Sequence, residues 1–147
     1  RGVRCTLVEP RPHVFNQAQA RHVRHARKQA RREGLPEPPA AAFALRQIPA
    51  RFGGAWCEAH AELLAAASVI VGMHPDEATE HIVDEAVSRR KPFAVVPCCV
   101  FPREPGLRLS YEAWCEHLAA KHPAIAQAFL GFAGKNRVIY CTGFPPD

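Results

Sequence analysis

The sequence has no hydrophobic run long enough to cross a membrane and no apolar segment typical of a signal peptide. Its six cysteines form no C-x-x-C pair, so the spacing indicates neither a zinc ribbon nor a thioredoxin-type redox motif. It also has no internal repeat, which excludes a solenoid. We therefore expect an intracellular, cytoplasmic protein without a membrane partner, whose thiols stay free in a reducing compartment.

The length of 147 residues allows one domain with a hydrophobic core. The formal net charge is +5, and most of the positive excess lies between residues 21 and 32. The first residue is Arg1 rather than Met, and an apolar strand-like run follows almost at once. We therefore expect a fragment of a longer protein, with a first motif that precedes residue 1.

Short apolar runs alternate with amphipathic segments along the chain. Continuous apolar runs are typical of parallel strands that are buried on both faces. Alternating strands and helices favour right-handed crossovers, with helices on both faces of the sheet. The sequence therefore predicts an α/β fold with a doubly wound, mostly parallel sheet. The expected strands cover residues 3–8, 41–46, 68–71, 93–96 and 136–142, and the expected helices cover residues 17–33, 56–66, 76–89, 111–120 and 123–132.

Polar and reactive side chains follow two of these strands. In open α/β sheets, ligands bind beyond the carboxyl ends of the strands. The strand–helix–strand unit over residues 68–99 places two such ends close together in the predicted sheet. We expect a ligand site there, formed by His74, Pro75, Asp76, Pro97, Cys98 and Cys99.

The roles of these residues remain open at this stage. His74 is either a structural loop histidine or a catalytic base. Its surroundings do not match the H-E-x-x-H spacing, so this motif predicts no metal site. Cys98 and Cys99 either line a pocket or act as nucleophiles. A nucleophilic cysteine needs a lowered pKa, which His74 at the adjacent strand end would have to supply, so we favour packing or pocket lining.

Glu9 follows the first expected strand. A carboxylate at that position holds the ribose hydroxyls in nucleotide-binding α/β folds, although a solvated loop acid has the same local pattern. The glycine-rich turn that precedes such an acid is missing, since only Gly2 lies upstream.

The expected helix over residues 17–33 is strongly basic, and it has no acidic residue before Glu33. Most charge runs are solvated helix faces, but the lack of acidic partners also favours contact with phosphates of a nucleic acid. The candidate contacts are Arg21, Arg24, Arg27, Lys28, Arg31 and Arg32.

Three motifs together resemble the class I S-adenosylmethionine-dependent methyltransferases: V-E-P after the first strand, G-M-H-P-D-E-A-T-E after the third, and V-V-P-C-C after the fourth. The resemblance begins at the second strand of that fold and covers residues 1–147 to its last strand. More distantly, the histidine turn and the cysteine pair are similar to those of tRNA 2′-O-methyltransferases. The chain differs from that group at Pro75-Asp76 and at Val100-Phe101.

The resemblance implies a Rossmann-like methyltransferase fold that lacks its first strand and glycine-rich turn. It also implies methyl transfer from S-adenosylmethionine, with RNA as a possible substrate. Glu9 would then bind the ribose, Gln47 and Ile48 would lie near the adenine, and Met73 and His74 would contact the cofactor. Pro75, Asp76, Pro97, Cys98 and Cys99 would form the acceptor side, with His74 as the candidate base.

Other classes of function remain open. The chain has the features of a methyltransferase for a protein or a small molecule, in which the basic helix is only solvated. A catalytically inactive methyltransferase-like domain that serves as a binding module is another alternative. A dehydrogenase is a further alternative for a nucleotide-binding fold with a ribose-binding acid.

Overall fold

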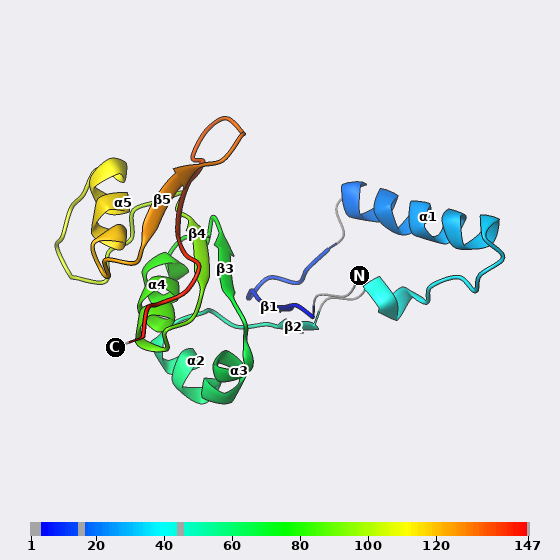
Figure 1. Cartoon of the computed structure of the whole chain (residues 1–147), viewed down its shortest axis with the longest axis horizontal. Helices are drawn as coiled ribbons and strands as arrows, with labels where there is room; N and C mark the ends of the chain where they lie inside the picture. The colour runs from blue at the N-terminus through cyan, green and yellow to red at the C-terminus, as the bar shows by residue number, and fades with distance from the viewer. Residues whose placement is uncertain (1–3, 15–16, 44–45, 147) are drawn as a thin grey trace. The chain divides into compact units, whose positions relative to one another are not determined.

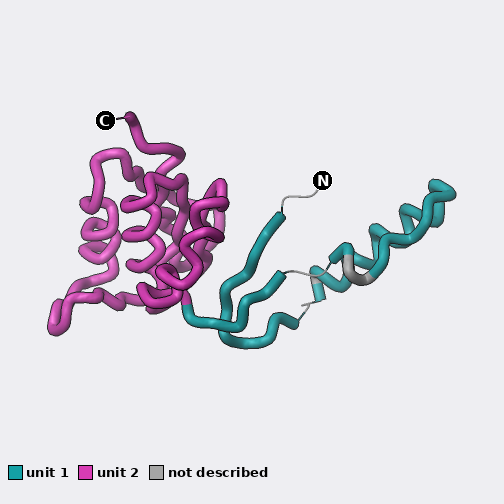
Figure 2. Tube along the Cα trace, turned by 90° about the horizontal axis from the view of Figure 1, so that it is seen from below, with its two compact units in different colours: residues 1–51 teal, residues 52–147 magenta. Residues whose placement is uncertain are grey.

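The computed structural model describes residues 4–14, 17–43 and 46–146 of the chain. The chain divides into two compact units, unit 1 with residues Arg1–Arg51 and unit 2 with residues Phe52–Asp147 (Figure 2). Each unit is described separately below. None of the described helices combines the length and the apolar character that a bilayer crossing requires.

Unit 1 contains a short two-stranded sheet and a long helix (Figure 1). Strands β1 (Thr6–Val8) and β2 (Arg46–Ile48) are parallel, with Val8 opposite Ile48. Helix α1 (Gln17–Arg32) ends at Gly34, whose φ of +65° suits glycine at a helix terminus. Asn16, the residue before this helix, lies outside the described part of the chain.

The prediction of a strand over residues 41–46 is wrong for residues 41–43. Residues 44–45 lie outside the described part of the chain. A 3-10 turn, η1 (Ala40–Phe43), occupies that position, and the strand β2 begins only at Arg46. Ala42 N donates to Pro39 O over 2.9 Å, so the prolines start a turn. Alanine has little preference for strands, and nothing else in this run favours one.

Unit 2 contains a four-stranded mixed sheet in the order β3-β4-β6-β5. Strands β3 and β4 are parallel, whereas β6 runs antiparallel to both β4 and β5. The α/β class is therefore confirmed, but the chain forms two sheets, and the larger one is not mostly parallel. The elements of unit 2 are α2 (Gly54–Ala59), α3 (Ala61–Ala66), β3 (Ile70–Met73), α4 (Ala78–Ser88), β4 (Phe93–Val96), α5 (Tyr111–Ala119), β5 (Ala126–Phe129) and β6 (Arg137–Cys141).

Two predicted helices of unit 2 are wrong. The helix expected over residues 123–132 is the strand β5, which pairs with β6 over its whole length. This pairing overrides the helical preference of its alanines. The helix expected over residues 56–66 is interrupted at His60, whose φ is −121° and whose Nδ1 lies 2.8 Å from Trp56 O. The predicted strand over residues 93–96 matches β4, and the other predicted elements agree within three residues.

The core of unit 2 lies on one face of the sheet. Strand residues such as Ile70, Phe93 and Ile139 pack there against α4 and α5, in one cluster that also includes Cys57 and Leu64 of the first two helices. The opposite face of the sheet is exposed to solvent: the side chains of Val71 and Met73 there are 65% and 61% exposed. Within unit 2, the prediction of helices on both faces is therefore wrong.

Candidate functional site at the carboxyl ends of β3 and β4

The structure brings together two strand ends that the sequence marked as a site. Strands β3 and β4 are parallel neighbours, with Met73 opposite Val96. His74 N donates to Val96 O over 3.0 Å, so the pairing extends one residue beyond the strands. The segments 74–76 and 97–99 therefore leave the sheet side by side, as expected from their positions in a parallel pair.

The backbone after β3 makes a tight turn. His74 and Asp76 have φ angles of +51° and +47°, values that non-glycine residues rarely adopt. A Cβ atom at Gly72 would lie 2.8 Å from Ile82 Cδ1 and 3.0 Å from Pro75 Cγ, so only glycine fits between the strand and α4. The turn thereby directs His74 and Asp76 out of the sheet.

The Cys98 thiol donates a hydrogen bond to Asp76 rather than to His74. Its Sγ lies 2.9 Å from Asp76 Oδ1. Burial raises the pKa of the Cys98 thiol to about 12, and the hydrogen bond to the Asp76 carboxylate acts in the same direction. Cys98 therefore stays protonated at neutral pH. The partner of the Cys98 thiol is therefore Asp76 and not His74, which agrees with the preference for packing or pocket lining over a nucleophile.

His74 itself is exposed, and its Nε2 donates to Lys135 O over 3.1 Å, which ties the β3 turn to the loop before β6. The same loop places Lys135 Nζ 3.7 Å from the centre of the Tyr111 ring. Tyr111 in turn donates its hydroxyl to Pro97 O over 3.1 Å. Burial raises the pKa of Tyr111 to about 12, so the hydroxyl remains a donor. Tyr111 and Lys135 thus support the site, although no local pattern in the sequence marked them.

Met73 and the two prolines differ in exposure. Met73 is exposed on the open face of the sheet, Pro75 is half-buried, and Pro97 is buried. Pro97 thereby fixes the strand end that precedes the thiols, whereas Cys99 is exposed and Cys98 is half-buried.

The predicted cofactor residues of the first strand pair lie in unit 1. Glu9 accepts three hydrogen bonds from Arg11, including one of 2.7 Å from Nε. These hydrogen bonds hold the pKa of the Glu9 carboxyl below its usual value. Glu9 follows β1, so the expectation that Glu9, His74 and the thiols end strands of one sheet is wrong: they belong to two sheets.

Gln47 has a structural role that the sequence did not indicate. Its Nε2 donates to the carbonyl oxygens of Glu9 and Arg11, over 2.8 Å and 2.7 Å, and its Oε1 accepts from His13 N over 2.9 Å. The side-chain amide therefore fixes the segment after β1. Ile48 is half-buried at the end of β2, and its carbonyl accepts from Glu9 N and Ala50 N.

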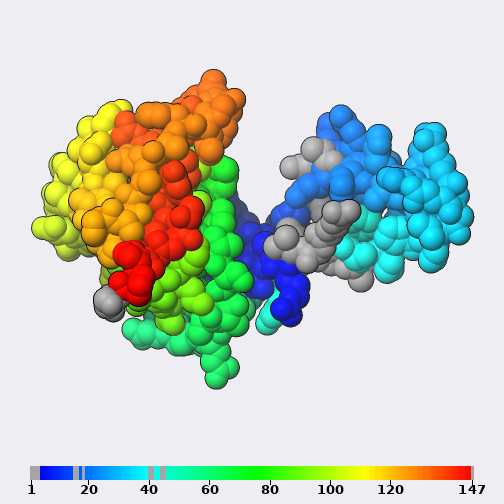
Figure 3. Space-filling model, in the orientation of Figure 1, coloured from blue at the N-terminus to red at the C-terminus, as the bar shows by residue number. Residues whose placement is uncertain are grey.

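The predicted basic contacts all lie on α1, whose atoms are drawn in blue to cyan in Figure 3. Arg21, Arg24, Lys28 and Arg32 are exposed, whereas Arg27 is half-buried. Arg31 forms an ion pair with Glu37, so part of the positive charge is neutralised within the chain. Arg21, Arg24, Lys28 and Arg32 therefore remain as exposed cations of this helix.

A buried carboxylate between α4 and α5 was not anticipated from the sequence. Glu80, which is 4% exposed, accepts from Arg103 N over 2.6 Å and lies 2.9 Å from His117 Nε2 and 2.8 Å from Lys121 Nζ. Asp84 extends this network to Lys121 and to the Arg103 side chain. The signal was the spacing of four residues between Glu80 and Asp84, which places both carboxylates on one face of α4. Lys121 follows the end of α5, so no helical spacing marked it.

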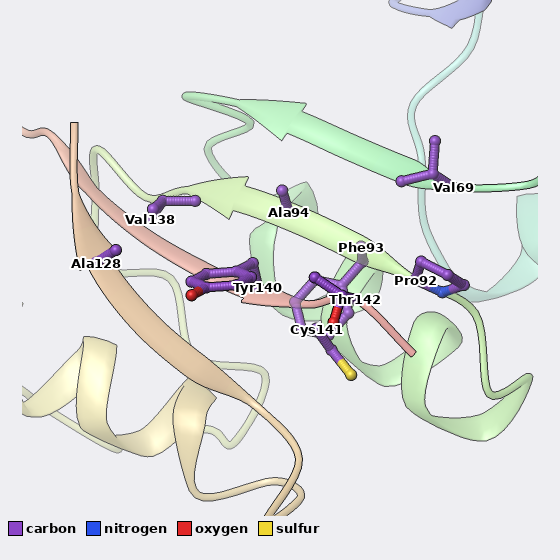
Figure 4. Close-up of a pocket in the computed structure, with 9 residues that line it drawn as sticks. All are labelled: Val69, Pro92, Phe93, Ala94, Ala128, Val138, Tyr140, Cys141 and Thr142. Carbon is purple, nitrogen blue, oxygen red and sulfur yellow. The ribbon is translucent and has the colours of Figure 1, made fainter. Parts of the chain in front are cut away.

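The open face of the sheet carries a shallow apolar depression of about 550 Å³ (Figure 4). Its walls include Ala94 of β4, Ala128 of β5, and Val138 and Tyr140 of β6. The depression contains few polar groups, and His74, Asp76 and both site thiols lie outside its lining. It therefore does not supply the chemistry of the candidate site.

Comparison with family models, with curated proteins and with solved structures finds no match to the chain. Function is therefore inferred from the geometry of the described residues.

Proposed function

We propose that the chain is a class I S-adenosylmethionine-dependent methyltransferase domain. The strand order β3-β4-β6-β5, with β6 antiparallel between β4 and β5, carries this proposal. The family that the sequence resembles has a sheet that ends in the same way, with its last strand antiparallel between its fifth and sixth strands.

Each sheet by itself is compatible with the proposal. Strands β1 and β2 form a parallel pair in unit 1, and β3, β4, β6 and β5 form a mixed sheet of four strands in unit 2.

The proposed roles of the residues follow the strand ends. Glu9 binds the ribose hydroxyls of S-adenosylmethionine, for which its two oxygens must exchange the Arg11 hydrogen bonds for ribose hydroxyls. Ile48 contributes the apolar contact to the adenine, since the Gln47 amide is already bonded to backbone groups. For unit 2, the resemblance assigns cofactor contacts to Met73 and His74. His74 is also the candidate base, because its ring is exposed beyond β3.

Calorimetric titration of the natural full-length protein with S-adenosylmethionine tests this proposal. We expect saturable binding that Glu9→Ala weakens at least about tenfold, because hydrogen bonds from ribose to a charged acceptor are lost. Glu33→Ala is the matched control: it removes an exposed carboxylate of the same unit and should leave the affinity unchanged. Absence of binding, or equal binding by the Glu9 and Glu33 variants, would contradict the proposed cofactor site.

RNA is the acceptor class that the charge of α1 favours. Arg24 and Lys28 are both exposed and lie four residues apart on one face of the helix. Each phosphate contact with a single strand contributes about 0.7 to the slope of log affinity against log salt concentration. The double variant Arg24→Ala, Lys28→Ala should therefore lower that slope by about 1.4.

The control for this titration is Arg4→Ala with Arg108→Ala, which removes the same net charge from exposed positions outside α1. If both double variants change the salt slope equally, α1 is not the docking surface. Cofactor binding without RNA binding favours a protein or small-molecule acceptor. RNA binding without cofactor binding favours the inactive binding module.

A further inference from the structure

We propose that Asp76, Cys98 and Cys99 form a zinc-binding site at the carboxyl ends of β3 and β4. The proposal goes beyond the methyl-transfer function and does not depend on it. One carboxylate oxygen of Asp76 and the two Sγ atoms all lie within 4.8 Å of one another. Among the described residues, this is the group of histidine, cysteine and acidic side chains whose geometry admits a shared ion.

The spacing of the three donors suits a tetrahedral ion after a small adjustment. Sulfur ligands lie about 2.3 Å from zinc, so two tetrahedral sulfur ligands lie about 3.8 Å apart. Separations of up to 4.8 Å must shorten by about one ångström. Rotation of the side chains can bring the ligand atoms this much closer without displacing the strands. Cys99 and Asp76 are exposed, so these rotations meet little resistance, and an ion can enter from solvent.

The chemistry of the donors selects zinc over magnesium or calcium. Two thiols provide soft sulfur ligands, which favour zinc, whereas the hard cations prefer an all-oxygen shell. On binding, each thiol releases its proton to solvent and each sulfur forms a bond to the ion. Two thiolates and one carboxylate carry three negative charges, and the divalent ion leaves a net charge of −1. The Cys98 proton that now bridges to Asp76 Oδ1 is the proton that the ion replaces.

Hydrogen bonds to backbone carbonyls hold the segments that carry the three donors. Thr79 Oγ1 and Thr79 N both donate to Asp76 O, over 2.7 Å and 3.1 Å. The buried Pro97, which precedes the thiols, accepts from the Tyr111 hydroxyl. These contacts fix the backbone that carries Asp76 and the thiols, so that binding requires adjustment of the side chains only.

Three protein ligands leave the fourth position of zinc open to water or to a substrate atom. Structural zinc sites are closed by four protein ligands, whereas catalytic sites keep one position free. If the chain also transfers methyl groups, an acceptor oxygen or sulfur at this position would lose its proton more readily. That last step rests on the proposed methyltransferase function, whereas the binding of zinc does not.

Titration of the reduced, metal-free protein with Co²⁺ tests the site directly. We expect a thiolate-to-cobalt absorption band that saturates at one equivalent and disappears when Zn²⁺ is added. Cys98→Ser and Cys99→Ser should each weaken binding at least about 100-fold, because even the loss of an outer partner of a metal ligand costs 10- to 100-fold. Asp76→Asn should weaken binding while keeping the thiolate band. Cys5→Ser, which removes an exposed thiol of unit 1, is the matched control and should bind normally.

Two results would overturn the proposal: no thiolate band in the wild-type protein, or a band that persists unchanged in both the Cys98 and Cys99 variants. Tryptophan fluorescence of each variant shows whether unit 2 remains folded, since both tryptophans, Trp56 and Trp114, belong to it. Because Asp76 is exposed, Asp76→Asn should fold normally even if a cysteine variant does not. The metal titration contains no S-adenosylmethionine, so its outcome is independent of the cofactor-binding test.

Discussion

Replacing Glu80 by glutamine is expected to lower the free energy of unfolding of unit 2 by about 3 kcal/mol. The carboxylate lies between α4 and α5 and holds Lys121, His117 and the backbone N–H of Arg103. A neutral amide removes the charge but keeps the volume, so Lys121 loses one of its two carboxylate partners, with Asp84 remaining. Breaking a buried ion pair from one side costs more than the pair contributes in net stability, because the remaining charge is left desolvated.

Urea unfolding followed by tryptophan fluorescence measures this loss in the full chain, since Trp56 and Trp114 both report on unit 2. Glu62→Gln is the control, because Glu62 is an exposed carboxylate on α3. It should change stability by less than about 0.5 kcal/mol. A Glu80→Gln variant as stable as the control would show that the network contributes little.

The same network predicts how stability depends on pH. Burial alone would raise the pKa of Glu80, but hydrogen bonds from Lys121, His117 and Arg103 N outweigh it and hold the pKa at about 2, against the usual 4.5. Because the folded state has the lower pKa, the stabilisation is present above about pH 4.5 and is lost as the pH falls towards 2. In urea titrations across this range, the wild-type protein should lose stability more steeply than Glu80→Gln.

Substituting Gly72 by valine is expected to destabilise unit 2 by about 3 kcal/mol, at the upper end of the cost of overpacking a core. The first added carbon would meet Ile82 Cδ1 at 2.8 Å and Pro75 Cγ at 3.0 Å. Neither neighbour can withdraw easily, since Ile82 is buried in α4 and Pro75 is a rigid ring. The strand and the helix must therefore separate.

A double variant identifies the cause. Ile82→Val removes the Cδ1 atom, so Gly72→Val with Ile82→Val should recover part of the stability that Gly72→Val loses. Gly131→Val is the matched control, because no atom lies within 4 Å of its added carbon. Equal unfolding midpoints for Gly72→Val and Gly131→Val, or costs that simply add in the double variant, would contradict the steric explanation.

Local sequence patterns were sufficient to predict the central part of the fold. The run Phe93–Val96 predicts β4 to the residue, and the apolar spacing after Pro75 predicts α4 within two residues. Ser110 caps α5, and its side chain accepts from Ala113 N over 3.1 Å. These features depend on neighbours three or four residues apart, or on one short strand, so periodicity and capping specify them. The proximity of segments 74–76 and 97–99 was predictable in the same way, because two consecutive parallel strands end on the same side of the sheet.

Contacts between distant segments specify the rest, and no local pattern contains them. Residues 126–129 form a strand because β6 pairs with them, although their alanines favour a helix. The apolar character of β3 is the same whether one face or both are covered, so the sequence could not indicate the open face. The contact of Asp76 with Cys98, and that of Glu80 with His117 and Lys121, joins residues 22 or more positions apart. Such contacts form only when strands and helices pack, because hydrogen-bond and ligand geometry depends on distance in space and not on separation along the chain.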